Sequence, residues 1–133
     1  MKKLLLIPVV VFLQSCAIYD AYMMTHYDPN EYKSITDIRA GAQLYKGQCA
    51  NELLSISNAN KLAFDTRAFA MYSEQVPRNE NVIKSSIELD KIAQGLATQY
   101  NNGKVSPLFC KIKFESVEHN AETMQKIIGA RPR

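Results

Sequence analysis

The stretch SPLFCKIKFESVEHNAETMQKIIG, residues 106–129, decides the fold of this chain. Ser106 can cap a helix with its hydroxyl, and Pro107 suits the first helical position, where its missing N–H has no intrahelical partner. The residues that follow form an apolar stripe at alternating steps of four and three: Cys110, Phe114, Val117, Ala121, Met124 and Ile128. This spacing predicts a helix with one buried face that ends at Gly129.

The first turn of this helix is more apolar than the rest. Leu108 and Phe109 widen the apolar face there. We therefore expect the start of this helix to contact more than one neighbour.

Three further helices are expected before this one. The first begins at Ser34, which with Asp37 resembles an acidic capping box, and extends to Ile56. Its stripe consists of Ile35, Ile38, Ala42, Tyr45, Cys49, Leu53 and Ile56. Residues 57–60 separate it from a second helix, which ends before Pro77. The inner face of the second helix consists of Leu62, Thr66, Phe69 and Tyr72.

The third helix is expected between Asn79 as its cap and Gly103 as its stop. Its apolar residues are Val82, Ile83, Ile87, Leu89, Ala93, Leu96 and Tyr100. No segment shows the sustained alternation of a strand, and short links favour antiparallel neighbours. The sequence therefore predicts an all-α fold, a small antiparallel bundle of about four helices over residues 34–129, followed by a basic tail at 130–133.

Cys49 and Cys110 are expected to form the disulfide of this bundle. In an up-down-up-down arrangement the first and last helices lie side by side. At 1.5 Å per residue both sulfurs then fall within one turn of the same height. Their spacing does not fit a zinc or haem motif, so we expect no metal and no cofactor.

The N-terminus reads as an export signal. Lys2 and Lys3 precede an apolar run over residues 4–13, which is too short to cross a bilayer as a helix. Leu13-Gln14-Ser15-Cys16 resembles the lipobox of bacterial lipoproteins. That resemblance implies removal of residues 1–15, lipidation of Cys16 and a tether over residues 16–33. The alternatives are an ordinary secretory signal with Cys16 in a disulfide, or a buried N-terminal segment.

The resemblance also implies a location. Ala17 after the lipidated cysteine suggests passage to the outer membrane of a Gram-negative envelope, with the domain on the periplasmic face. That compartment is oxidising, which suits the expected disulfide.

Charge argues against a nucleic-acid partner. The signal carries two lysines and no acid, so the net charge falls from +3 to about +1 in the mature chain. A nucleic-acid surface needs a concentrated basic stripe. The one basic cluster of note, Arg131-Pro132-Arg133, is expected to be a frayed, solvated end, with an anchor on lipid head groups or cell-wall anions as the alternative.

No catalytic constellation emerges from the sequence. His26 falls in the tether, and His119 is turned away from the apolar stripe of the last helix. Glu115, Glu118 and Glu122 form a row that we expect to be a solvated surface. The sequence contains no Gly-x-Ser-x-Gly, no phosphate-binding glycine loop and no His-Glu-x-x-His. We therefore expect a protein that is not an enzyme.

Phe64 and Met71 are the candidate partner surface. They lie off the expected inner face of the second helix, where either a neighbouring element covers them or a partner protein binds them. The leading hypothesis is a binding or structural accessory module of an envelope complex. The alternative is an immunity, inhibitor or exclusion lipoprotein that neutralises a toxin, a hydrolase or an incoming phage or plasmid.

Overall fold

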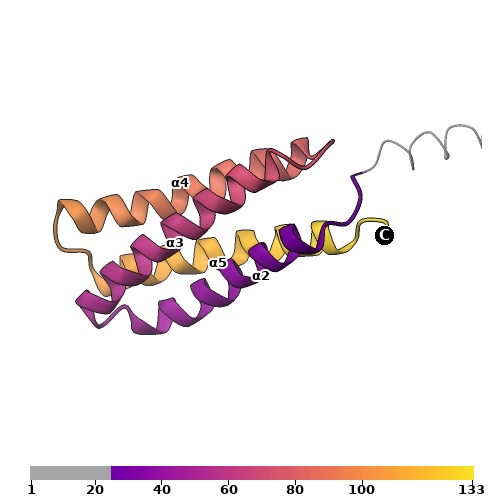
Figure 1. Cartoon of the computed structure of the whole chain (residues 1–133). Coiled ribbons are helices and arrows are strands. Elements are labelled where there is room, and N and C mark those ends of the chain that lie inside the picture. The colour runs from indigo at the N-terminus through magenta and orange to yellow at the C-terminus, as the bar shows by residue number, and fades with distance from the viewer. Residues whose placement is uncertain (1–24) are drawn as a thin grey trace, which may run out of the picture.

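The described part of the chain folds as four α-helices packed in antiparallel pairs, which confirms the predicted fold class (Figure 1). A computed structural model describes residues 25–133. The helices are α2 (Pro29–Tyr45), α3 (Glu52–Ser73), α4 (Glu80–Asn102) and α5 (Pro107–Gly129), and a short 3₁₀ turn, η1 (Lys46–Gln48), follows α2. The predicted signal, Cys16 and most of the predicted tether lie outside the described residues. No helix in the described part of the chain is long and apolar enough to cross a membrane.

The bundle consists of two closely packed helix pairs, α2 with α5 and α3 with α4. The stripe of α5 is buried throughout, as its spacing predicts. The core between the pairs includes Ile35, Ile38, Leu62, Phe69, Leu89, Leu96, Phe114 and Val117.

The start of the first helix differs from the prediction. α2 begins at Pro29, and the Asp28 carboxylate accepts hydrogen bonds from the N–H groups of Asn30 and Glu31. Asp28-Pro29 is therefore a cap followed by a proline at the first helical position, the same signal that Ser106-Pro107 gives for α5. The capping role assigned to Ser34 was wrong, because the helix already includes that residue.

The end of the first helix also differs from the prediction. α2 stops at Tyr45, and Asn51 caps α3 by accepting a hydrogen bond from the N–H of Leu54. The break lies at residues 46–51 and not at 57–60. It changes the helical phase, so Leu53, expected in the core, is 81% exposed.

The predicted disulfide is present. Cys49 and Cys110 are bonded, with their Cα atoms 5.8 Å apart. Cys49 lies in the turn after η1, just beyond the helix on which it was expected, and Cys110 lies in the first turn of α5. The bond therefore joins the two elements at one end of the bundle, which we call the distal end. The opposite end, where residues 25–28 and the C-terminus lie, is the proximal end (Figure 1).

The C-terminal tail is packed against the domain, so the expectation of a frayed, solvated end was wrong. The Arg131 side chain is only 9% exposed and pairs with Glu31. The N–H of Tyr27 donates to the carbonyl oxygen of Pro132, and the Arg133 guanidinium stacks over the Tyr27 ring. The two ends of the described chain are thereby held together.

Candidate partner-binding surface

Phe64 and Met71, the predicted partner residues, are both exposed on the outer face of α3. Their exposed fractions are 73% and 61%, so no element within residues 25–133 covers either side chain. They are seven residues apart, which places them two turns apart on one face of the helix. Leu53 shares this face from the first turn of α3. We call these three residues the α3 face.

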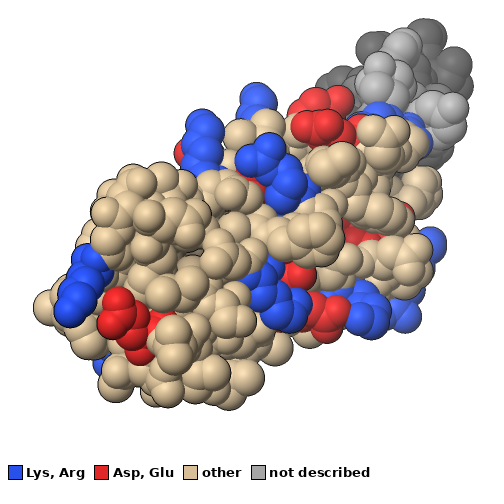
Figure 2. All heavy atoms as spheres, turned by 60° about the vertical axis from the view of Figure 1, so that its left-hand side comes forward, with Lys and Arg blue, Asp and Glu red and all other residues tan. Residues whose placement is uncertain are grey.

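A larger group of exposed apolar side chains lies at the distal end, and the sequence did not indicate it. Six of the ten large exposed hydrophobic residues in the described chain are found there: Leu44, Leu53, Leu54, Leu108, Phe109 and Ile112. They come from the last turn of α2, the first turn of α3 and the first two turns of α5. Figure 2 turns this end toward the reader and shows mostly uncharged residues there, with both acidic and basic groups among them.

Leu108 and Phe109 explain why the distal end was missed. Their position suggested contact with a second neighbour, but their exposed fractions are 68% and 37%. The preceding link, residues 103–106, contains no helix or strand and leaves both side chains at least partly exposed. Ile112, one turn beyond Leu108, is 50% exposed and continues the same apolar surface.

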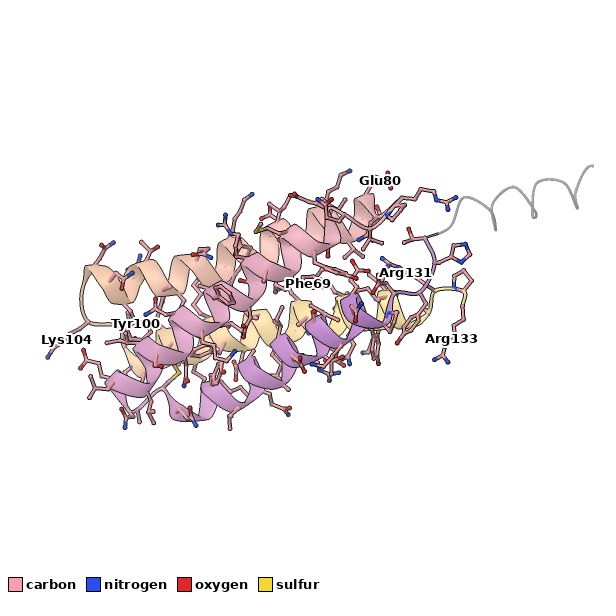
Figure 3. The ribbon with its side chains drawn as sticks, viewed as in Figure 1. Phe69, Glu80, Tyr100, Lys104, Arg131 and Arg133 are labelled. Atoms are coloured by element: carbon pink, nitrogen blue, oxygen red, sulfur yellow. A yellow bond between two sulfur atoms is a disulfide. The ribbon has the colours of Figure 1, made fainter. Side chains whose placement is uncertain are left out.

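A cavity of about 260 Å³ opens beside Phe109 at the distal end. Its lining consists of Gln99, Lys104, Val105, Ser106 and Phe109. The Lys113 ammonium lies 5.3 Å from the centre of the Phe109 ring, and Figure 3 shows Lys104 at the tip of the α4–α5 link. The cavity thus combines an aromatic wall with one lysine, Lys104, in its lining, and Lys113 lies outside that lining near the same ring.

A second hollow, of about 320 Å³, lies between α2 and α3. Ile38 and Phe69 contribute apolar lining, and Asp37, Lys61 and Asp65 contribute charged lining. These charges are already paired, because Lys33 binds Asp37 and Lys61 binds Asp65. The hydrogen bond from Lys61 to Asp65 raises the pKa of the Lys61 ammonium, so this lysine stays charged and is not a candidate base.

The residues that could carry chemistry do not converge. His26 lies in the segment before α2 at the proximal end, whereas His119 is exposed on α5. Each glutamate of the acidic row pairs with a cation, since Glu115 meets Lys111, Glu118 meets Lys46 and Glu122 meets Lys126. The Lys126 hydrogen bond and the nearby Arg39 charge lower the pKa of Glu122. Within residues 25–133 no group of three or more His, Cys, Asp or Glu side chains could hold a metal ion.

The most buried polar cluster lies at the proximal end and was not expected from the sequence. The Arg131 guanidinium donates to the Glu31 carboxylate at 2.5 Å and to the Asn79 side-chain oxygen at 2.6 Å. Asn79 in turn donates to Glu31 and to the Ser73 carbonyl oxygen. The Asn79 side chain therefore makes its hydrogen bonds within this cluster. It makes no capping hydrogen bond to α4, which begins at the next residue. Figure 3 shows Arg131 at this end of the bundle.

Asp28 connects this cluster to the start of α2. Its carboxylate accepts the Tyr72 hydroxyl at 2.9 Å as well as two backbone N–H groups. Partial burial acts to raise the pKa of Asp28, but these hydrogen bonds and the Arg131 charge outweigh it and lower the pKa below its ordinary value of 3.8. The contacts fix the entry of the chain into the domain.

A second polar cluster lies between α3 and α4 around Asp90. The Asp90 carboxylate accepts hydrogen bonds from Thr66 and Gln94 and pairs with Arg67 at 2.8 Å. This buried carboxylate is therefore fully partnered and holds α3 against α4. Asp90 and its three partners thus form a structural contact between the two helices.

Comparison with known proteins gives no family. No protein-family model, no curated protein and no solved structure matches this chain. The function must therefore be argued from the surface of the domain itself.

Proposed function

We propose that this protein is a non-enzymatic, lipid-anchored binding module of a bacterial envelope complex, attached to the outer membrane through Cys16. The observation that carries the proposal is the concentration of exposed apolar side chains at the distal end of a well-packed bundle. Large apolar side chains gathered on the surface in this way are typical of a protein or membrane interaction site. The lipobox resemblance of residues 13–16 supports the anchor, and the disulfide is consistent with an oxidising, extracytoplasmic compartment.

The geometry supports a module that reaches away from its anchor. The described chain begins at the proximal end, and the apolar surface lies at the other end of helices of up to 23 residues. At 1.5 Å per residue such a helix is about 34 Å long. A protein held through its N-terminus would thus present the distal end to partners away from the attachment point.

The proposal is tested by site-specific photo-crosslinking in the producing cell. A photoreactive amino acid replaces Leu108 at the distal end, Phe64 on the α3 face, or exposed Lys84 on α4 as the control position. We expect a discrete protein adduct at one of the first two positions and none at Lys84. Absence of adducts at both apolar positions, with the protein present at normal levels, would contradict the proposal.

The identity of the adduct separates the two functional classes. A resident envelope protein supports an accessory role in an envelope complex. A toxin, hydrolase or phage or plasmid protein that crosslinks only after exposure to that agent supports the alternative, an immunity or exclusion role.

A further inference from the structure

We propose that the distal end binds an amphipathic segment of a partner protein in which acidic side chains flank one large apolar anchor, with the anchor seated in the cavity beside Phe109. The inference rests on the proposed function and specifies the partner's chemistry. It combines three observations: the exposed apolar residues, the cavity and the lysines around it.

The apolar residues give the segment a place to bury its own apolar face. Leu108, Phe109 and Ile112 lie within the first two turns of α5, and Leu44 and Leu54 lie at the adjoining ends of α2 and α3. Burial of apolar area on both sides is the main source of binding free energy, at roughly 25 cal/mol per Å² before the costs of association. Interfaces of this kind depend on a few large anchors near their centre.

The cavity beside Phe109 sets the size of that anchor. Its volume of about 260 Å³ lies just below the roughly 300–1,000 Å³ typical of small-molecule sites. A cavity of this size that opens to solvent suits one inserted side chain better than a whole cofactor or metabolite. The Phe109 ring and Val105 supply apolar walls for it.

The charges around the cavity select an acidic partner. Lys104 and Lys113 make no ion pair with any carboxylate among residues 25–133. Lys111, on the same two turns of α5, has its nearest carboxylate, that of Glu115, at 3.9 Å. Carboxylates on the partner would complete these pairs and guide the approach.

The α3 face lacks this charge signal. The cations nearest to Phe64 and Met71 on α3 are Lys61 and Arg67, which already pair with Asp65 and Asp90. An acidic partner would therefore gain less there. The distal end is the surface that fits an acidic, amphipathic segment.

The test uses the full mature lipidated chain in phosphatidylcholine nanodiscs, with a displayed library of random 20-residue peptides as the probe. We expect selected peptides to combine a Phe, Trp or Leu with flanking Asp or Glu. Their affinity should fall about tenfold or more for Phe109→Ser with Ile112→Ser, as for interface hot spots. It should also fall for Lys104→Glu with Lys113→Glu, and peptides with Lys in place of their acids should regain affinity for that variant.

The matched control is Phe64→Ser with Met71→Ser on the α3 face, which should bind the selected peptides like the unaltered protein. Thermal melting by circular dichroism verifies that each variant is folded. Failure to select any peptide, selection of peptides without acids, or loss of binding only in the α3-face variant would overturn the inference. The crosslinking test judges the proposed function separately, since an adduct at Phe64 would leave that function standing.

Two other occupants of the distal end, a lipid surface and a second copy of the chain, are examined with the same lipidated protein. Acceptor vesicles of equal parts phosphatidylcholine and phosphatidylglycerol should not be recruited to the nanodisc-bound protein. Sedimentation of the full chain in detergent should show no dimer that depends on Phe109. Recruitment or dimerisation that Phe109→Ser with Ile112→Ser abolishes would mean that a lipid surface or a second copy occupies the distal end, and would overturn the inference.

Discussion

The Arg131 guanidinium lies 2.5 Å from the Glu31 carboxylate, although the two residues are 100 positions apart in the chain. Both side chains are almost fully removed from solvent. Asn79 bonds to both of them, so the pair has no unmet hydrogen-bonding group at its centre. The last residues of the chain are thus part of the folded domain and not an appendage to it.

Arg131→Ala should lower the free energy of unfolding by about 3–5 kcal/mol, because it leaves the buried Glu31 carboxylate without its cation. Urea denaturation measures the change. Arg133→Ala is the control and should cost within about 0.5 kcal/mol, as for surface changes generally. Replacing Glu31 and Arg131 together by Met should cost less than Arg131→Ala alone. Equal stability of the two single arginine variants would contradict the assigned role of Arg131.

Loss of the disulfide should lower stability by about 4 kcal/mol in the chain-entropy model, given a sequence separation of 61 residues between Cys49 and Cys110. That is a large share of the roughly 5–15 kcal/mol typical of a small domain. Cys49→Ala, Cys110→Ala and the double variant should have similar urea midpoints, since each removes the same bond. A reaction of Cys49 or Cys110 with a thiol reagent in oxidised, unfolded protein would contradict the bond.

Cys16→Ser should leave the protein unprocessed or released from the membrane fraction, because the acyl chains supply the membrane affinity. Sucrose-gradient fractionation and the mass of the mature N-terminus measure this. The conservative change Ser15→Gly keeps a small residue before the cysteine and should leave processing intact. Processing of the Cys16→Ser variant and its recovery with the outer membrane would show that the lipobox hypothesis is wrong.

Asp28 should contribute to stability in a pH-dependent way. Its pKa in the folded domain lies below the ordinary value of 3.8, so its contribution is fully present above that pH and is lost as the pH falls below it. Asn can still cap α2, so Asp28→Asn should cost about 1 kcal/mol near neutral pH. The difference from the unaltered protein, measured by urea denaturation across the acid range, should shrink toward zero as the pH falls through the lowered pKa of Asp28 in the folded domain. A constant difference would contradict this role.

Gly95→Ala should yield a more stable protein than Gly129→Ala. A Cβ at Gly95, exposed on α4, would meet nothing within 4 Å, so alanine should stabilise by up to about 1 kcal/mol through helix propensity. A Cβ at Gly129 would lie 3.0 Å from the Tyr32 ring and force that ring to move. Thermal unfolding of both variants checks the pair. A lower midpoint for Gly95→Ala than for Gly129→Ala would contradict the packing described.

The sequence predicted those elements whose boundary signals are local. Ser106-Pro107 and Gly103 mark helix ends through the properties of single residues, and α4 and α5 were placed correctly. The disulfide was also predicted correctly, because helix order alone brings Cys49 and Cys110 to one end. Cys49 itself was expected on the first helix, whereas it lies in the turn after η1.

The predictions from the sequence were wrong where the apolar spacing of one helix continues into the next without a gap. They were also wrong where contacts between residues far apart in the chain determine which side chains are buried. Apolar spacing continues from Tyr45 through Cys49 to Leu53, so the break at η1 leaves no gap in the pattern. Pairing of Glu31 with Arg131 depends on the closure of the whole bundle and has no local signature. The distal surface was missed for a similar reason, since the exposure of Leu108 depends on how little of the α4–α5 link covers it.

The position of the disulfide has a mechanical consequence. A load applied between residue 25 and the distal end acts along the axis of α2, parallel to its contacts with α5. The contacts between α2 and α5 are then loaded at the same time, in shear, and do not break one after another. The Cys49–Cys110 bond covalently stops α2 from sliding past α5 at the loaded end. The disulfide therefore keeps the distal ends of α2 and α5 together even when the non-covalent contacts between these helices loosen.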